Sequence, residues 1–308
     1  MKNPNITLSL EVARARNLSQ PVVALESTVI THGLPYPQNL ELAWDMEQEI
    51  RHNGATPATI AVLDGKIRIG ISDEELVRLT QAVSTLKVSC RDFATAIIKK
   101  ASGGTTVAGT MLAAEQAGIK VFATGGIGGI HREGRYDISA DLQALADTPM
   151  IVVCAGAKAI LDLPATLEYL ETMSVPVVGY QTDEFPAFYS RESGLDVSAR
   201  LDSPEEIAAF ARAHWSAGGR GAVLVANPVP ITDAIPRSEM EPIIVKASAE
   251  SVAQNIHGQA LTPFLLKRIS ELTQGRSLRT NLSLLLNNAR LAAQIARAMA
   301  TQHHIHAI

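Results

Sequence analysis

The sequence predicts an α/β fold, a three-layer α/β/α sandwich with a mixed central sheet and a helical C-terminal region. Short apolar, β-branched runs alternate with helical segments from Val22 to Ala226, which is typical of helices packed on both faces of a sheet. The dipeptide Asp64-Gly65 between two apolar runs predicts a hairpin, so the sheet contains antiparallel strands. From Met240 onward the sequence predicts only helices.

Length and composition set the remaining limits. The chain has 308 residues, of which 46% are hydrophobic and 19% charged, as in soluble globular proteins. This length permits two ordinary domains or one large α/β domain, and we predict a single domain over residues 1–308. The formal net charge of −4 argues against a nucleic-acid polymer or an anionic membrane as a partner, and leaves a free nucleotide possible.

Targeting signals and cysteines indicate a cytoplasmic protein. The N-terminus lacks the apolar core of a signal peptide, and no apolar run reaches the ~18 residues of a membrane span. The two cysteines, Cys90 and Cys154, stand in strand-like apolar segments, which predicts buried, reduced thiols and no disulfide.

The predicted elements follow one another along the chain. Strands are predicted where short apolar runs occur, over Pro21–Leu25, Thr59–Leu63, Lys66–Ile69, Lys87–Asp92, Val121–Ala123, Met150–Cys154, Val177–Tyr180 and Gly221–Ala226. Helices are predicted from apolar spacing and start signals, over Leu8–Ala15, Asn39–Asn53, Ser72–Val83, Phe93–Ala101, Val107–Ala117, Ala140–Ala146, Pro164–Thr172, Asp202–Ala217, Ile243–Ile256, Thr262–Gln274 and Asn281–Ala300. Thr31–Pro37 is predicted to be a loop.

Lys158 is the prime candidate for covalent chemistry. It follows Ala155-Gly156-Ala157, which has no long side chains to screen it, and precedes Ala159–Leu161, which we predict to be the first turn of a helix. A helix N-terminus and apolar surroundings both disfavour the ammonium form and expose a nucleophilic amine, as a Schiff-base lysine requires. The alternative is an ordinary surface lysine at a helix start.

Glu26 is the candidate general acid. A carboxyl group at the end of the apolar run Pro21–Leu25 is buried, and burial raises its pKa toward the range in which it donates a proton at neutral pH. The alternative is a structural glutamate paired with an arginine.

Two glycine-containing stretches are candidates for anion binding. The run from Gly126 to His131 fails as a dinucleotide fingerprint because His131 occupies the third small position, so we expect a loop whose amides approach an anion. Gly103–Thr106 opens a predicted helix, where unpaired amides bind phosphate, with Lys87 as a possible counter-charge. Ordinary helix capping and a solvated lysine are the alternatives.

Carboxylates at Asp137 and Asp141 are candidates for a metal site. At a spacing of i and i+4 they can face the same space, and oxygen ligands without cysteine suit Mg²⁺ or Mn²⁺. Either aspartate could instead cap the helix. The tail histidines His303, His304 and His306 resemble a metal cluster, but we expect a disordered terminus there.

Taken together, these stretches resemble the indigoidine synthase A-like family. The resemblance covers about Pro21 to Ala300 and is carried by Val22–Thr28, Thr31–Gly33, Gly54–Ile60, Lys87–Asp92, Gly104–Val107, Val121–His131, Asp137–Leu142, Val153–Asp162, Val225–Pro228 and Thr262–Leu266. It implies a mixed-sheet α/β/α fold that assembles as a homotrimer. It also implies reversible cleavage of the C–C glycosidic bond of pseudouridine 5′-phosphate to uracil and ribose 5-phosphate, a reaction of nucleotide catabolism.

The resemblance also implies a role for individual residues. Lys158 would form the covalent adduct that becomes a Schiff base at C1′, and Glu26 would be the proton donor. Asp137 would hold one Mn²⁺ per subunit. The substrate would be contacted by Lys87, Val107, Thr124, His131, Ser139, Ala140, Asp141 and Asn281. Two departures affect substrate affinity, because Cys90 replaces an expected arginine and the loop 132–136 is short.

Two other functions are compatible with parts of this pattern. An aldolase-like lyase acting on another phosphorylated sugar would use the same lysine, but Glu26 and the segment Asp137–Leu142 favour C–C glycoside cleavage. A regulatory nucleotide-binding protein on the same fold would tolerate loss of Lys158.

Overall fold

The computed structural model describes residues 3–301 apart from 83, 133–136, 257, 259 and 260. The tail histidines His303, His304 and His306, and most of the short loop 132–136, lie outside the described residues. Within the described part of the chain, no helix is long and apolar enough to cross a membrane.

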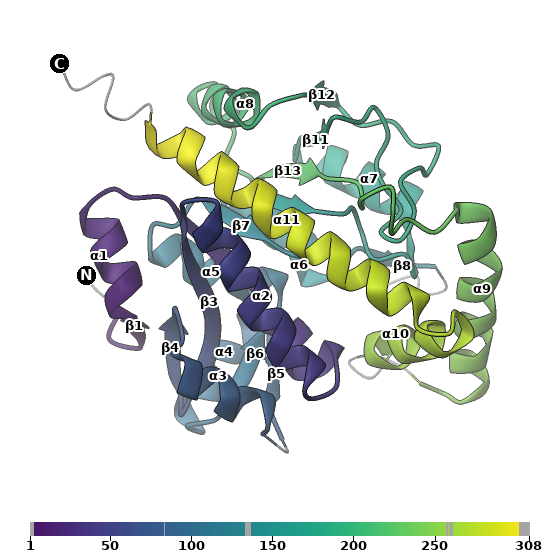
Figure 1. The fold of residues 1–308 in the computed structure, drawn as a ribbon, viewed down its shortest axis with the longest axis horizontal. Helices are drawn as coiled ribbons and strands as arrows, with labels where there is room; N and C mark the ends of the chain where they lie inside the picture. The colour runs from purple at the N-terminus through teal and green to yellow at the C-terminus, as the bar shows by residue number, and fades with distance from the viewer. Residues whose placement is uncertain (1–2, 83, 133–136, 257, 259–260, 302–308) are drawn as a thin grey trace.

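A mixed sheet forms the centre of the molecule (Figure 1), with the strand order β1-β4-β3-β2-β7-β9-β13-β11-β12. From β3 to β12 neighbouring strands are parallel, whereas β3 pairs antiparallel with β4 and β6. The strands are β1 Ile6–Leu8, β2 Val22–Leu25, β3 Thr56–Leu63, β4 Lys66–Ile69, β5 Leu86–Val88, β6 Gly103–Thr105, β7 Val121–Ala123, β9 Ile151–Cys154, β11 Val177–Tyr180, β12 Ala199–Leu201 and β13 Val223–Ala226. A separate two-stranded ladder joins β8 Ile130–His131 to β10 Leu161–Asp162.

Helices cover both faces of this sheet. Figure 1 shows α11, α2 and α8 on the front face and α5, α6 and α7 behind it, while α9 and α10 pack together at one end of the molecule. The helices are α1 Leu10–Asn17, α2 Gln38–His52, α3 Asp73–Thr80, α4 Phe93–Ile98, α5 Val107–Gln116, α6 Ala140–Asp147, α7 Leu163–Thr172, α8 Pro204–Ser216, α9 Arg237–Ala253, α10 Leu261–Leu272 and α11 Arg276–Thr301. The three-layer prediction is confirmed.

The parallel strands explain where the site lies. The strands β2, β7, β9 and β13 are buried along their whole length, as expected for a sheet covered on both faces. Their carboxyl ends meet at one edge of the sheet, and the next residues along the chain are Glu26, Thr124, Ala155 and Asn227. Ligands of open α/β sheets bind at this edge.

Several local predictions were wrong. Thr31–Gly33, the start of the predicted loop Thr31–Pro37, belongs to the π-helical turn η1 Val29–Gly33. Gly103–Thr105 forms strand β6, since its glycines allow β5 to approach closely; a Cβ on Gly103 would lie 2.3 Å from the Leu86 carbonyl oxygen. The three-residue strands β1 and β12 were not predicted. Cys90 is exposed in the short 3₁₀ turn η2 Cys90–Asp92, although Cys154 is buried as predicted.

Candidate active site

A single cavity of about 500 Å³ brings together almost all of the predicted site residues. It lies at the carboxyl ends of the parallel strands and is closed on one side by α10 and α11. Its lining includes Glu26, Lys87, Val107, His131, Asp137, Ser139, Ala140, Asp141, Lys158 and Asn281. Thr124 is the exception, since it is fully buried behind Glu26 and does not line the cavity.

Glu26 follows β2 and is 9% exposed. The hydroxyl of Thr124, at the end of the neighbouring β7, donates a hydrogen bond of 2.5 Å to Glu26 Oε1. Burial raises the pKa of the Glu26 carboxyl group, and the positive charges of Lys158 and Lys87 together with the Thr124 hydroxyl only partly oppose this rise. The direction of this pKa shift is the one expected from the sequence, and the role of Glu26 as the acid stays a prediction.

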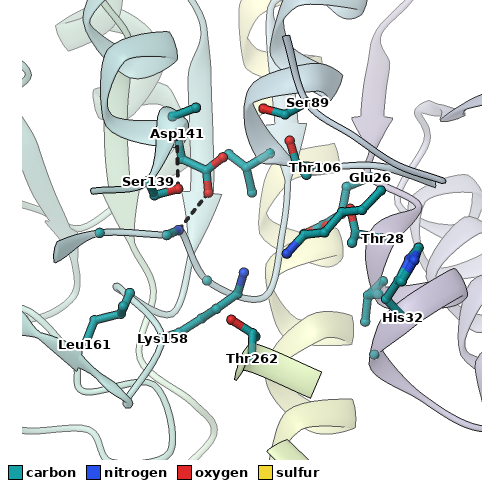
Figure 2. Close-up of a pocket in the computed structure, with 18 of the residues that line it drawn as sticks. Glu26, Thr28, His32, Ser89, Thr106, Ser139, Asp141, Lys158, Leu161 and Thr262 are labelled. Atoms are coloured by element: carbon teal, nitrogen blue, oxygen red, sulfur yellow. Dashed lines mark hydrogen bonds between the residues drawn. The ribbon is translucent and has the colours of Figure 1, made fainter. Parts of the chain in front are cut away.

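Lys158 reaches into the cavity from the segment after β9 (Figure 2). Gly156 permits this path, because it has φ +88° and a Cβ there would lie 2.1 Å from the Pro186 carbonyl oxygen. The Lys158 amide donates to the Ile127 carbonyl at 3.1 Å, and the Lys158 carbonyl accepts from the Leu161 amide at 3.0 Å. The predicted helix over Ala159–Leu161 is wrong, since this segment is a turn leading into β10.

Asp141 is buried and links the start of helix α5 to the loop that contains Gly128. Its Oδ1 accepts a hydrogen bond of 2.9 Å from the Ala108 amide, and its Oδ2 accepts one of 2.8 Å from the Gly128 amide. Gly128 must be glycine, because a Cβ would lie 2.2 Å from Ser139 Oγ. The hydroxyl of Ser139 caps α6 by accepting from the Asp141 amide at 3.2 Å.

The two aspartates do not form the expected pair. Asp137 precedes α6 and is exposed, whereas Asp141 belongs to the first turn of α6 and is buried, so the helical i, i+4 argument was wrong. Asp141 already uses both oxygens on backbone amides. None of the described residues donates a hydrogen bond to the Asp137 carboxylate, and no group of three or more His, Cys, Asp or Glu suited to a metal occurs in the described part of the chain.

The start of α5 offers one free amide to the cavity. Thr106 caps the helix by accepting from the Gly109 amide at 3.2 Å, and the Ala108 amide is bound to Asp141. Among the described residues nothing accepts from the Val107 amide. Lys87, half-buried in the middle of β5, adds a positive charge, although burial and the nearby Lys158 lower its pKa.

His131 and Asn281 approach the cavity from other elements. His131 belongs to β8, and its pKa is lowered chiefly by burial, while Asp137 opposes and Lys158 adds to the effect. Asn281, on the first turns of α11, is 9% exposed. The last predicted helix therefore supplies a residue to the site, which the sequence predicted only through the family resemblance.

Some lining residues were not predicted from the sequence. They include Thr28 and His32 around η1, Phe188, and Thr262 and Leu266 on α10. The Phe188 ring lies so close to Gly126 that a Cβ on that glycine would be 2.7 Å from it. Gly126 itself was therefore a sequence signal for a close neighbour, but nothing in the sequence said which residue that neighbour is.

The geometry defines a site at the edge of the sheet, where a lysine, a buried glutamate with a raised pKa and the start of helix α5 line one cavity. Residues 11–298 match the model of the family described as "Indigoidine synthase A like protein". The chain belongs to this family.

Relatives and solved structures agree with this assignment. The chain is 57% identical over 302 residues to the pseudouridine-5′-phosphate glycosidase of Paracoccus denitrificans, covering 97% of this chain and 99% of that protein. It is 53% identical to the enzyme of that name from Caldanaerobacter subterraneus, covering 96% of each chain. The crystal structure of the prealnumycin C-glycosynthase AlnA in complex with ribulose 5-phosphate superposes with a TM-score of 0.91 at 40% identity, over 98% of this chain and 99% of that one. An indigoidine synthase A-like protein from Thermotoga maritima superposes with a TM-score of 0.88 at 37% identity, over 96% of each chain.

Proposed function

We propose that this protein is a pseudouridine-5′-phosphate glycosidase, which reversibly cleaves the C–C bond between C1′ of the sugar and C5 of uracil to give uracil and ribose 5-phosphate. One observation carries the proposal. A lysine amine and a buried carboxyl group with a raised pKa line the same cavity, in a chain whose near full-length relatives bear this name.

The lysine solves the main chemical difficulty. A uracil carbon is a poor leaving group, so protonation alone, as in ordinary glycosidases, is a weak route. Electrons from the uracil ring first displace O4′ from C1′, which opens the sugar and leaves a C1′=C5 double bond, and O4′ takes up a proton. The Lys158 amine then adds to C1′, loses a proton and returns the electron pair to the uracil ring. Once C5 is protonated, the nitrogen lone pair forms the C=N bond as the C1′–C5 bond breaks and its electron pair passes into the uracil ring. Water hydrolyses the resulting Schiff base, which releases ribose 5-phosphate and restores the amine.

Glu26 supplies the proton that the leaving uracil carbon requires. Burial holds its carboxyl group protonated to higher pH than usual, and the proton passes to C5 before the C–C bond breaks. Thr124 holds the other carboxyl oxygen and so fixes the direction of the acid.

The opposite side of the cavity would bind the sugar phosphate. The free Val107 amide and the Lys87 ammonium group are suited to the phosphate oxygens, and Ser139, Ala140, Asp141, His131 and Asn281 line the space for the sugar and base. Asp137 has a carboxylate available for Mn²⁺, which would neutralise phosphate charge, as such ions do when one carboxylate and a substrate share them.

We also propose that the protein works in the cytoplasm as a homotrimer with one Mn²⁺ per subunit. The two free cysteines fit a reducing compartment. Sedimentation velocity would test the trimer, and excess chelator should abolish turnover until Mn²⁺ is added back. Full activity in chelator would contradict the metal proposal.

The central experiment is uracil release from pseudouridine 5′-phosphate, followed by chromatography. Native protein should release uracil, and Lys158→Ala should lose at least about 10⁴-fold in kcat because the nucleophile is gone. Borohydride reduction with ribose 5-phosphate should add the sugar phosphate mass to the Lys158 peptide alone. Labelling of another lysine would contradict the assigned nucleophile, and absence of uracil release would contradict the function.

A further inference from the structure

Arg132 fastens the turn that carries Lys158. Its Nη2 donates to the Ala159 carbonyl at 3.1 Å, and its Nε donates to the Leu161 carbonyl at 3.2 Å. The Leu161 amide in turn donates to the Lys158 carbonyl at 3.0 Å. The turn directly after the lysine is therefore held by its own amide and by one guanidinium group.

The same guanidinium is bound to helix α9. Arg132 donates hydrogen bonds to both carboxylate oxygens of Glu241. Nη1 donates to Oε1, and Nη2 donates to Oε2 at 3.2 Å. These hydrogen bonds lower the pKa of Glu241, because they stabilise its ionised form. A bidentate pair fixes the plane of a guanidinium, so Glu241 also determines where Arg132 holds the two carbonyl groups.

Burial of Ala159, Ile160 and Leu161 in the hydrophobic core also holds this turn, but the strand pairing beside it is short. The ladder between β8 and β10 has two residues in each strand, with Leu161 opposite His131, and so short a pair is marginal by itself. Figure 1 shows β8 beside α9, where the ion pair joins them. Arg132 does not line the active-site cavity and instead borders a second cavity of about 300 Å³, so any effect of Arg132 on the site must pass through the turn that it binds.

We propose that Arg132 is a positioning residue for the reaction. Together with Glu241, it holds the turn from Lys158 to Leu161 so that the amine stands within bonding reach of C1′. This inference rests on the proposed function, because the role of Arg132 is exerted through Lys158.

Replacing the guanidinium group of Arg132 with an amine tests this positioning role. Arg132→Lys keeps the charge but cannot hold two carbonyls and a carboxylate at once. We expect kcat for uracil release, and the rate at which borohydride traps the Lys158 adduct, to fall by about 10–100-fold, since misplacement by about 1 Å can cost 10²-fold. KM should stay within about threefold, because ground-state contacts remain. Glu241→Gln should reduce the same two rates less.

The chain provides a matched control on the same helix. Glu239, two residues before Glu241, forms a bidentate pair with Arg276 that touches no part of the Lys158 turn. Arg276→Lys and Glu239→Gln should keep kcat within about twofold of native, even where they lower the melting temperature as much as Arg132→Lys does. Equal losses of kcat in the two pairs, or a native trapping rate in Arg132→Lys, would overturn the proposal.

Amide hydrogen exchange in the ligand-free protein separates this inference from the proposed function. The amides from Lys158 to Leu161 should exchange faster in Arg132→Lys and at the native rate in Arg276→Lys. Unchanged exchange in Arg132→Lys contradicts the positioning role. Absence of uracil release by native protein contradicts the function, and the two failures are seen in different measurements.

Discussion

Glu26 and Asp141 are buried carboxyl groups on opposite sides of one cavity, and their partners differ (Figure 2). Asp141 accepts hydrogen bonds from the backbone amides of Ala108 and Gly128. It therefore links the start of α5 to the loop that contains Gly128. Glu26 accepts one hydrogen bond, from the Thr124 hydroxyl, and burial raises its pKa. Asp141 therefore fixes the backbone on one side of the cavity, whereas the environment of Glu26 on the other side favours its protonated form.

The difference shows that hydrogen-bond partners, more than residue type, decide what a buried carboxyl group can do. A carboxylate that accepts one amide on each oxygen is held in a fixed position by those two bonds, and one lone pair on each oxygen remains for a ligand. A carboxyl group with one hydroxyl partner retains a free oxygen and a proton to give. Each of the following predictions changes one side of the cavity and leaves the other intact.

Glu26→Gln should have the largest effect. The amide keeps the shape of the side chain but has no transferable proton, so uracil release should fall by about 10²–10⁴-fold. Trapping of ribose 5-phosphate on Lys158 should survive, because that step does not need this proton. The pH profile of uracil release should lose its alkaline limb, which in the native protein reports ionisation of Glu26. Release at the native rate would make Glu26 structural and His131 the next candidate for the acid.

The same variant has a stability signature. The folded-state pKa of Glu26 is raised, so its contribution to stability is fully present below the pKa of an unfolded glutamate and is lost as pH rises through the folded value. Denaturant unfolding should therefore show native protein losing stability relative to Glu26→Gln as pH rises from acid to alkaline. A constant difference across that range would contradict the raised pKa.

Asp141→Asn should lower the stability of the protein, because it weakens the hydrogen bonds that fix the backbone on the Asp141 side of the cavity. Asparagine has one acceptor oxygen, so one of the amides of Ala108 and Gly128 loses its partner and faces an NH₂ group. The free energy of unfolding should fall by about 1.5–3 kcal/mol, as for a lost hydrogen bond to a charged group. Asp147→Asn, at the exposed end of the same helix, is the control and should change stability by less than about 0.5 kcal/mol. Equal changes in the two variants would contradict this role of Asp141.

The sequence predicted the layers and the strand-end location of the site because both depend on local patterns. Apolar runs bounded by small residues define β2, β7 and β9, and the carboxyl ends of adjacent parallel strands must meet. The candidates Glu26 and Lys158 followed from their positions after such runs. Both line the cavity.

Features that depend on distant contacts could not be predicted from local patterns. The turn after Lys158 looked helical because Ala159–Leu161 has good helix formers, but pairing of β10 with β8 overrides that preference. The roles of Asp137 and Asp141 separate only once the Ala108 and Gly128 amides are in place. The family resemblance implied that Thr124 contacts the substrate. In the structure β2 and β7 are neighbours, and the Thr124 hydroxyl instead donates a hydrogen bond to Glu26.

Thr124→Val should have the smallest effect on rate and gives the sharpest test of the Glu26 side. Valine keeps the shape of threonine but cannot donate to Glu26 Oε1. The Thr124 hydrogen bond lowers the pKa of Glu26 against the larger effect of burial, so its loss should raise that pKa further. The alkaline limb of the uracil-release profile should move to higher pH, while the maximal rate stays within about tenfold of native because the acid itself remains.

Thr124→Ser is the matched control, since it keeps the hydroxyl and removes only a methyl group. Its alkaline limb should coincide with that of the native protein, even if loss of the buried methyl lowers stability by about 1 kcal/mol. A limb that moves equally in the serine and valine variants would mean that packing, and not the hydrogen bond, sets the pKa of Glu26. A limb that moves to lower pH in Thr124→Val would reverse the sign required by a hydroxyl that donates to the ionised carboxylate, and the account of Glu26 as a tuned acid would then fail.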